Sequence, residues 1–218
     1  MKRAVICFTR VPKPGVTKTR LLPVLQPEQC AALHWSFLKD LAEVYRQMHV
    51  HLYVAYTPDA DWEQLKSVFP PAGYIPQKGK DLGERMYRAI RKVMDLGYTS
   101  VLLTGADLPL LTKAHLESGF AALEDHDIAI GPTSDGGYYL IGMKKPRKEV
   151  FHVEGYGGAS VFENTVSAAA DAGLTVGQAL LCDDVDTPED LRRLYASADP
   201  ASHTGRYLKI LKQEGVAL

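Results

Sequence analysis

Three features that mark whole classes of protein are scarce or missing in this sequence of 218 residues. Its cysteines, Cys7, Cys30 and Cys182, are odd in number and form no Cys-x-x-Cys pair. Neither a disulfide framework nor a zinc site is therefore expected, and a reducing, cytoplasmic setting follows. The first apolar run, residues 4–8, is too short for a signal peptide or a membrane span. The formal net charge of -1 argues against a nucleic-acid partner.

What remains is the composition of an ordinary globular chain, with 46% hydrophobic and 23% charged residues. A chain of this length can bury a full core, so we expect residues 1–218 to form a single α/β domain. Apolar runs predict strands near residues 3–9, 50–56, 73–77, 98–104, 127–132 and 139–143. Helical spacing and capping patterns predict helices near residues 28–48, 59–68, 82–94, 113–123, 159–172 and 188 onward.

The stretch Leu103–Pro109 is expected to end a central strand with a carboxylate at its tip. Residues 98–104 carry no charge and are mostly apolar or β-branched, as in a parallel strand covered on both faces. Gly105 and Pro109 stop the strand. Asp107 then falls where open α/β sheets bind ligands, and is placed to hold a divalent metal on phosphates. The alternative is that Asp107 only caps the next helix or turns the loop.

The loop after the first predicted strand, residues 10–20, combines four cations, two prolines and a glycine. Cations and free backbone amides in such a loop suit phosphate binding, so Arg10, Gly15, Lys18 and Arg20 are nucleotide-binding candidates. We expect this loop at the surface, with Lys18 and Arg20 as the main phosphate contacts. It is not a Walker A loop, because Thr17 rather than glycine precedes Lys18. The alternative is a solvated basic loop.

The stretch that follows residue 76 offers weaker candidates for nucleotide binding. Asp81 and Glu84 have the spacing of a capping box at the start of a helix, which explains both residues structurally. Capping does not explain Gln77 or the glycines of this stretch, which would let a flat base approach the backbone. Gln77, Gly83 and Arg85 are therefore predicted to border a nucleotide.

Two later segments place further carboxylates after strands. Residues 133–139 carry Asp135 before a double glycine, which is either a simple hairpin turn or a site beside Asp107. We interpret Asp135, Gly136, Gly137 and Tyr138 as acceptor-binding residues, with Asp135 in a catalytic role.

The second segment is Asp184-Val185-Asp186-Thr187-Pro188. Thr187 and Pro188 are explained as the cap and first residue of a helix. Helix capping does not explain Asp184 and Asp186, which alternate just before the cap. Their side chains are expected to point the same way.

Five motifs together resemble one known family, the uncharacterised GT-A-type transferases labelled glycosyltransferase-like and related to molybdenum-cofactor and phospholactate guanylyltransferases. The motifs, which span nearly the whole chain in order, are Phe8-Thr9-Arg10-x-Pro12-x-Pro14-Gly15-x-x-Lys18-Thr19-Arg20-Leu21, Asp81-Leu82-Gly83-Glu84-Arg85, Gly105-x-Asp107-x-Pro109, Gly131-Pro132-x-x-Asp135-Gly136-Gly137-Tyr138-Tyr139 and Asp184-Val185-Asp186-Thr187-Pro188-Glu189-Asp190.

The resemblance implies a three-layer α/β/α nucleotide-diphosphosugar transferase (GT-A) fold with a mostly parallel, mixed central sheet. It also implies Mg²⁺ (or Mn²⁺) at Asp107, with Asp186 first and Asp184 second as further metal ligands, by similarity to the sugar-acid cytidylyltransferases.

The sequence therefore predicts a metal-dependent transferase that acts on a nucleotide or nucleotide-sugar and a small-molecule acceptor. Nucleotidyl transfer with release of pyrophosphate is preferred, because such transfer needs charge neutralisation and alignment more than acid or base chemistry. Glycosyl transfer from a nucleotide-sugar is the alternative. Glycosyltransferases of this fold usually carry Asp-x-Asp after the central strand, whereas only Asp107 stands there in this chain. A third interpretation is an inactive nucleotide-binding regulatory module, against which the retained cations and carboxylates argue.

Overall fold

The computed structural model describes residues 2–69, 71–153 and 156–218. The strands are β1 (Arg3–Thr9), β2 (His51–Tyr56), β3 (Gly73–Pro76), β4 (Ser100–Thr104), β5 (Ile128–Pro132), β6 (Tyr138–Met143) and β7 (Val176–Gln178). The α-helices are α1 (Pro27–Arg46), α2 (Leu82–Met94), α3 (Lys113–Asp125), α4 (Val161–Asp171), α5 (Pro188–Ser197) and α6 (His203–Gln213). Short 3₁₀ helices are η1 (Thr19–Leu21), η2 (Trp62–Ser67) and η3 (Glu149–Phe151).

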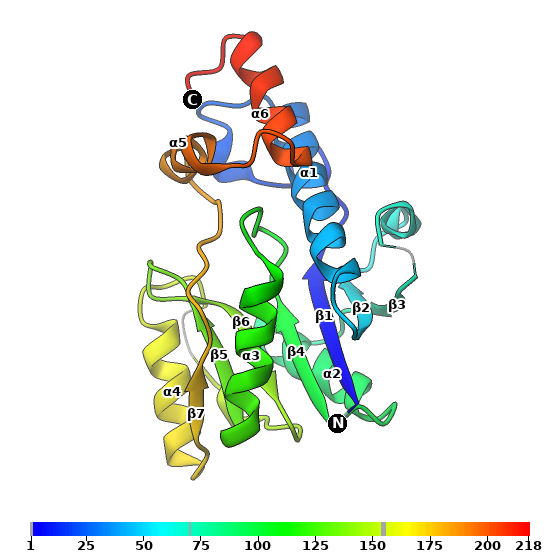
Figure 1. Ribbon diagram of the computed structural model, residues 1–218, viewed down its shortest axis with the longest axis vertical. Helices are drawn as coiled ribbons and strands as arrows, with labels where there is room; N and C mark the ends of the chain where they lie inside the picture. The colour runs from blue at the N-terminus through cyan, green and yellow to red at the C-terminus, as the bar shows by residue number, and fades with distance from the viewer. Residues whose placement is uncertain (1, 70, 154–155) are drawn as a thin grey trace.

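The strands form one sheet in the order β3-β2-β1-β4-β6-β5-β7 (Figure 1). All neighbouring pairs are parallel except those of β6, which runs antiparallel to β4 and β5. The predicted mostly parallel mixed sheet is confirmed. Strand β4 lies at its centre and every one of its residues is buried, as its uncharged apolar sequence predicts.

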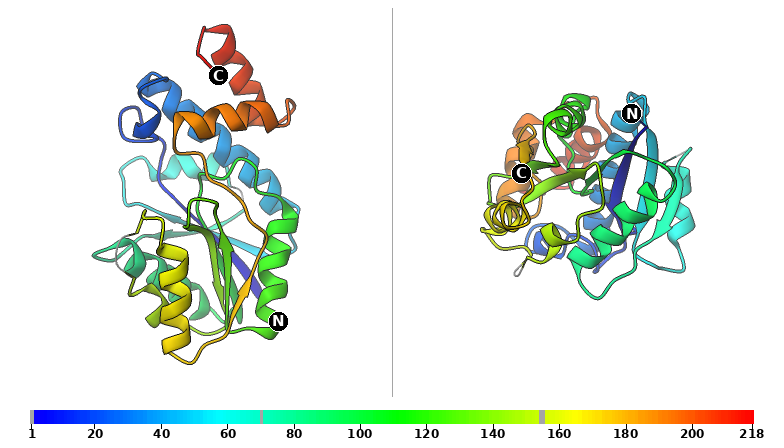
Figure 2. Two further views of the ribbon diagram at one scale, coloured as in Figure 1. Left: turned by 90° about the vertical axis from the view of Figure 1, so that its left-hand side faces the viewer. Right: turned by 90° about the horizontal axis from the view of Figure 1, so that it is seen from below.

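Helices cover both faces of the sheet, which confirms the predicted three layers (Figure 2). One face packs against α1 and α3 through residues such as Leu41 and Phe120. The opposite face packs against α2 and α4 through residues such as Ile90 and Ala169. Because β1, β2, β3, β4 and β5 run in one direction, their carboxyl ends share one edge of the sheet, at the top in Figure 1.

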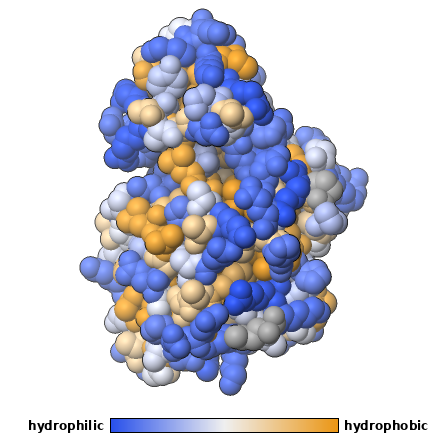
Figure 3. Space-filling view, viewed as in Figure 1, coloured by the Kyte–Doolittle hydropathy of each residue, from blue (hydrophilic) through white to orange (hydrophobic). Residues whose placement is uncertain are grey.

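Helices α5 and α6 pack beyond this edge against the first half of α1 and against η1. Leucines from all four elements form a small separate core, and the Asp40 carboxylate on α1 accepts hydrogen bonds from the first amides of α6. The space-filling view shows an indentation on the left between this helical layer and the sheet (Figure 3). The segment between β7 and α5, residues 179–187, runs from the sheet to the helical layer (Figure 1). It brings Asp184 and Asp186 to the carboxyl edge, where the Val185 amide donates to the Asp107 carbonyl.

Two local predictions need correction. The helix expected over residues 59–68 is the 3₁₀ helix η2. The capping box expected at α2 is incomplete: Asp81 accepts a hydrogen bond from the Glu84 amide at 2.7 Å, but Glu84 bonds to the amide of Lys80 instead of returning to Asp81. The three cysteines are free and buried, and no helix of the described residues is long and apolar enough to cross a membrane.

Candidate active site

Lys18 joins three segments at the carboxyl edge of the sheet. Its Nζ lies 2.7 Å from Asp107 Oδ1, beyond the end of β4, and donates to Asp186 Oδ1 at 2.9 Å and to the Val185 carbonyl at 2.6 Å. The backbone strengthens this junction, since the Val185 amide donates to the Asp107 carbonyl at 3.0 Å. The β1–α1 loop, the β4 end and the segment before α5 therefore meet at one buried ammonium group.

The burial of Lys18 corrects the expectation that the whole basic loop lies at the surface. The Lys18 side chain is 3% exposed, whereas that of Arg20 is 68% exposed. The backbone of Lys18 has φ 54°, a left-handed conformation that it alone adopts among the non-glycine residues of the described chain. Such a conformation costs on the order of 1 kcal/mol or more, so the ion pairs compensate for local strain.

The rest of the loop is fixed, as its prolines suggest. Thr17 is buried and its hydroxyl accepts a hydrogen bond from the Lys13 amide at 2.9 Å. Lys13 pairs with Asp59 and Asp61, so this cation is turned toward the β2–η2 loop and away from Lys18. Gly15 lies at a turn with φ 71°, where it supplies backbone freedom. Arg10 and Arg20 remain as the exposed cations beside Lys18.

The helix cap predicted after Asp186 is present and holds that aspartate in place. Thr187 accepts from the Asp190 amide, and Asp190 bonds back to the Thr187 amide at 2.7 Å and to the Asp186 amide at 3.1 Å. The Asp186 side chain is thereby directed to the cations of the basic loop, with Arg20 Nη1 at 3.4 Å from its Oδ2. The cap and the candidate site are parts of one local structure.

The electrostatics of the cluster balance opposing effects. Burial alone would lower the pKa of Lys18, but the charges of Asp107 and Asp186 outweigh burial and raise that pKa. Burial is the largest single effect on Asp107 and would raise its pKa, but the surrounding groups, Lys18 first among them, together lower that pKa. At Asp184, burial and the negative charge of Asp186 together raise the pKa to about 6. The carboxylates of Asp107, Asp135 and Asp186 all act on Asp184 in the same direction, and the charge of Lys18 opposes them.

His34 on α1 is a site residue that the sequence analysis missed. Its side chain is 5% exposed, its Nε2 lies 3.4 Å from Asp107 Oδ1, and it lines the cavity between the basic loop and the carboxylates. Burial lowers the pKa of His34 to about 4, so the imidazole is neutral near pH 7. The sequence predicts only that residue 34 lies within the helix expected over residues 28–48, and it gives no separate signal for this histidine.

Asp135 lies at the same end of the sheet as Asp107, because β6 pairs antiparallel with β4 and Leu140 is opposite Thr104. Its Oδ1 accepts from the Thr133 hydroxyl at 2.5 Å and the Gly137 amide at 3.0 Å. The charge of Asp135 contributes to the raised pKa of Asp184. The turn is therefore both a hairpin connection and a neighbour of the candidate site.

The glycines of this turn are explained by close packing. Gly136 has φ 87°, and a Cβ there would meet the carbonyl oxygen of Ala159, so any side chain would displace the loop before α4. Gly137 lies against Thr133. Tyr138 packs into the core on the α2–α4 face, beside Tyr156, rather than toward Asp135. Its predicted contact with an acceptor has no support in this arrangement.

The residues after β3 have structural roles that their sequence did not reveal. Gln77 is buried, its Nε2 donates to the carbonyls of Thr9 and Ala55 at 2.9 Å each, and its Oε1 accepts from Thr57. Its amide thus joins the ends of β1 and β2. These hydrogen bonds give Gln77 a structural role. Its contact with a nucleotide base stays a prediction.

Gly83 and Arg85 are also engaged by the protein. A Cβ at Gly83 would lie 2.5 Å from the Phe151 carbonyl oxygen, so the space beside it is filled by the last residue of η3. Arg85 donates from Nε to the Gly79 carbonyl at 3.2 Å and supports the turn before α2. Their nucleotide contacts remain a prediction.

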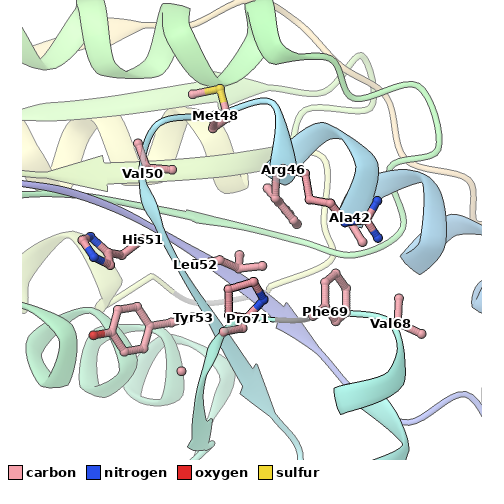
Figure 4. A pocket seen from close by; sticks show the side chains of 13 residues that line it. Ala42, Arg46, Met48, Val50, His51, Leu52, Tyr53, Val68, Phe69 and Pro71 are labelled. Carbon is pink, nitrogen blue, oxygen red and sulfur yellow. The ribbon is translucent and has the colours of Figure 1, made fainter.

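Two hollows differ in chemistry. The cavity of about 200 Å³ at the carboxyl edge is lined by charged and polar groups that include Arg10, Lys18, Asp107 and Asp186. The other, of about 440 Å³, lies at the opposite end of β2 and β3 between α1 and the chain before β3. Figure 4 shows its mostly apolar lining, with Met48, Leu52 and Phe69 among the side chains around it and Arg46 and His51 as polar members. It contains none of the residues that carry the site's charge.

The curated relatives of this chain have nucleotidyltransferase names. A 2-phospho-L-lactate guanylyltransferase from Methanoregula boonei is 29% identical over 94% of this chain and 87% of its own length. Another of the same name, from Methanocaldococcus sp. (strain FS406-22), is 27% identical over 88% of this chain and 81% of its own length.

Solved structures agree on the fold. A protein from Desulfovibrio desulfuricans G20, provisionally assigned as a nucleotide-diphospho-sugar transferase, is 36% identical, covers 98% of both chains and superposes with a TM-score of 0.89. Rv0371c from Mycobacterium tuberculosis H37Rv, in complex with manganese, covers 91% of this chain at 15% identity with a TM-score of 0.56. The second likeness is one of fold alone.

Fold and relatives together define a transferase of the nucleotide-diphospho-sugar transferase fold class. The family model described as "Uncharacterized protein conserved in bacteria (DUF2064)" matches residues 40–157. The chain belongs to this family.

Proposed function

We propose that this protein is a nucleotidyltransferase that joins the nucleoside monophosphate unit of a nucleoside triphosphate to a phosphorylated small molecule. An acceptor phosphate oxygen attacks the α-phosphorus and a new P–O bond forms. The bond from the α-phosphorus to the oxygen that bridges to the β-phosphate breaks, and pyrophosphate leaves with the electron pair. The observation that carries the proposal is the convergence of Lys18, Arg10 and Arg20 with Asp107 and Asp186 at the carboxyl edge of the sheet.

The cations of the β1–α1 loop supply phosphate binding in this reaction. Arg20 and Arg10 are exposed and can reach a ligand from solvent. Lys18 is held by Asp107 and Asp186 until phosphate oxygens compete for its ammonium group. Charge-assisted contacts of this kind contribute roughly 1.5–3 kcal/mol each, which makes the loop the main source of phosphate affinity.

The carboxylates fit a divalent metal. Their donors are oxygens, and Asp107 and Asp186 both lie within 3 Å of Lys18 Nζ. Burial, with the nearby charge of Asp186 second, raises the pKa of Asp184, and a cation would offset that charge. Among the described residues no group of three or more His, Cys, Asp or Glu side chains is arranged as a ligand set. Mg²⁺ usually takes only one or two protein carboxylates beside phosphates and water. Asp107 and Asp186, with Asp184 beside them, would hold Mg²⁺ or Mn²⁺, whose charge would neutralise the phosphates.

The acceptor is assigned to the side of the site where Asp135 lies. The turn of residues 133–137 is held by the Asp135 hydrogen bonds and by the close packing of Gly136, so its backbone presents a fixed edge. Asp135, Gly136 and Gly137 are proposed to position the acceptor against the α-phosphorus. Tyr138 supports the turn from inside the core.

GTP is the first nucleotide to test, because the relatives are named guanylyltransferases. Calorimetry with GTP and Mg²⁺ should give saturable binding that weakens at least tenfold in Lys18→Met and Arg20→Ala, from the contact energies above. CTP, ATP and a nucleotide-linked sugar are the comparisons. Undiminished affinity in both variants would remove the basic loop from the site.

Glycosyl transfer is the second candidate, favoured by the Desulfovibrio desulfuricans relative that was provisionally assigned to nucleotide-diphospho-sugar transferases. In that case the same cations and carboxylates would hold a nucleoside diphosphate as the leaving group, with Asp135 near the acceptor. Against it stands the single aspartate at the end of β4. Nucleotidyl transfer breaks a phosphorus–oxygen bond at the α-phosphate, whereas glycosyl transfer breaks the bond from the anomeric carbon of the sugar to the diphosphate oxygen. Their products therefore distinguish them.

A further inference from the structure

His34 is the buried polar side chain of the site for which the reaction scheme above has no use. In the described part of the chain neither of its ring nitrogens has a hydrogen-bond partner. An imidazole carries at least one N–H donor, and a buried donor without a hydrogen bond costs roughly 1–3 kcal/mol. A leucine or phenylalanine would pack at this helical position without that cost. The histidine therefore calls for an explanation beyond packing.

The geometry around Asp107 supplies one. Oδ1 of Asp107 is buried, and two groups lie close to this one oxygen: Lys18 Nζ, an ion-pair contact at 2.7 Å, and His34 Nε2 at 3.4 Å, neither with hydrogen-bond geometry. The lysine is the closer, and the imidazole stands just beyond ordinary hydrogen-bond length. The Asp107 side chain is nevertheless 39% exposed, so its exposure is carried by atoms other than Oδ1. One carboxylate oxygen faces the protein while the remainder of the group faces the cavity.

We propose that His34 is a positioning residue that holds Asp107 for metal binding when Lys18 turns to the phosphates of the nucleotide. With the ammonium withdrawn, the Nε2–H of His34 donates to Asp107 Oδ1 and keeps the carboxylate oriented, so that its other oxygen stays available on the cavity side. This inference rests on the proposed function, because it requires both a phosphate ligand for Lys18 and a metal at Asp107.

The surroundings of His34 suit this role. The imidazole is fixed on α1 beside Phe37, whose ring centroid lies 6.3 Å away in an edge arrangement, and the same ring lies 5.8 Å from Lys18 Nζ. Lys18 and His34 therefore share one wall of the cavity. Helix α1 has 20 residues and is joined to α6 by the hydrogen bonds that Asp40 accepts, so the backbone that carries the imidazole is firmly supported. Rigid support is what an outer-shell partner of a metal ligand needs.

The test is Mn²⁺ binding, measured by electron paramagnetic resonance of the free ion, with and without inorganic pyrophosphate. Replacing an outer-shell partner typically weakens metal affinity about 10–100-fold, and we expect a loss of that size in His34→Leu with pyrophosphate present. His34→Gln can place an amide N–H near the Nε2 position and should restore most of the affinity. His34→Asn keeps a polar group that is too short to reach Asp107, and should resemble His34→Leu.

The outcomes distinguish failure of the proposed metal site from failure of the proposed role of His34. Asp107→Asn is the control that removes the ligand itself. If the wild type binds Mn²⁺ no better than Asp107→Asn, the metal part of the proposed function fails, and this inference with it. If the wild type binds and His34→Leu binds equally well, the inference alone is wrong. A purely packing role would change the melting temperature of His34→Leu without this pattern of affinities.

A measurement on the wild-type protein avoids dependence on variants that fold poorly. Long-range ¹H–¹⁵N correlation spectra of the histidines distinguish the two neutral tautomers. We expect His34 to carry its proton on Nε2, facing Asp107, in the presence of Mg²⁺ and pyrophosphate. A proton on Nδ1 would direct an acceptor nitrogen at a carboxylate and would overturn the proposal.

Discussion

Lys18 Nζ lies 2.7 Å from Asp107 Oδ1, and this contact joins the loop after the first strand to the end of the central strand. The two residues are 89 positions apart in the printed sequence. Parallel β1 and β4 are adjacent in the sheet, so their carboxyl ends bring the two segments together. The sequence predicts that Lys18 binds phosphate and that Asp107 binds a metal. In the protein without ligands, these two side chains form an ion pair with each other.

Removing that cation should destabilise the fold. In Lys18→Met, Asp107 and Asp186 keep their charges without a buried counter-charge. Breaking a fully buried pair costs about 3–5 kcal/mol, and because both carboxylates are more than a third exposed we expect roughly 1–3 kcal/mol. At this chain length each kcal/mol lowers the melting temperature by ~2–4 °C. Scanning calorimetry measures the change.

Arg20→Ala is the matched control for this prediction. Arg20 approaches the same Asp186 but its side chain is 68% exposed, so its removal should leave the melting temperature nearly unchanged. Equal destabilisation by the two substitutions would show that the burial of Lys18 does not increase its contribution to stability.

Gln77→Ala tests a structural role against a binding role. The substitution removes the amide that bridges the ends of β1 and β2, and leaves buried carbonyls of Thr9 and Ala55 without that partner. We expect a loss of about 1–3 kcal/mol in the free energy of unfolding, with unchanged nucleotide affinity at a temperature where the variant is folded. Urea denaturation and calorimetry with GTP give the two quantities. A weakened nucleotide affinity without destabilisation would restore Gln77 to the site.

The fold could be predicted from the sequence because its signals are local and strong. Residues 98–104 carry no charge over a whole strand, and Thr187-Pro188 with Asp190 three residues after the cap mark the start of α5. The positions of Asp107, Asp135 and Asp186 follow from the rule that strand ends share an edge of the sheet. None of these inferences needs a side-chain conformation.

Side-chain partners could not be predicted in the same way. Gln77 looked unexplained because the carbonyls it bonds belong to strands that are distant in sequence. His34 was not singled out, because helical periodicity indicates which positions are buried but not which side chains lie opposite them. The burial of Lys18 depends on the chain before α5 folding over it, which no pattern within the basic loop records.

Asp135→Asn should separate charge from geometry in the turn of residues 133–137. Asparagine can still accept the hydrogen bonds of Thr133 and Gly137 through its carbonyl oxygen, so the melting temperature should be nearly unchanged. Turnover should fall at least tenfold if the charge acts on the acceptor or the reacting groups. Steady-state kinetics measures this effect. Wild-type kinetics in the variant would return Asp135 to a purely structural role.

Gly136→Ala provides the opposite case for the same turn. A Cβ at this positive φ would collide with the Ala159 carbonyl, so both stability and turnover should fall. A stable and active Gly136→Ala variant would mean that the packing of the turn against the loop before α4 is not needed.

The stability of the protein should fall on mild acidification partly because of His34. Its pKa is about 4 in the folded chain against an ordinary value of 6.5, since burial outweighs the attraction of Asp107. The unfolded chain therefore takes up a proton first. The contribution of His34 is fully present above pH 6.5 and is lost as the pH falls toward 4, with a slope of at most about 1.4 kcal/mol per pH unit.

Asp184 acts in the opposite direction, because its pKa is raised to about 6 and its folded form takes up a proton more readily. Lys18, Arg10 and Asp186 also face the imidazole, so the total profile mixes several groups. The comparison of wild type with His34→Leu isolates the histidine. Urea midpoints at pH 7 and pH 5 should differ more in the wild type than in the variant, and parallel profiles would contradict this assignment.

The most direct test of the central claim follows the α-phosphate of the nucleotide. The protein is incubated with Mg²⁺, GTP labelled at the α-phosphorus and phosphorylated three-carbon acids, beginning with the 2-phospho-L-lactate named in its relatives. We predict that label moves to the acceptor in equal amount to the pyrophosphate released, and that Lys18→Met and Asp107→Asn abolish both. If a nucleotide-sugar is consumed instead, with a nucleoside diphosphate as the nucleotide product and the sugar on the acceptor, nucleotidyl transfer is the wrong reaction for this protein.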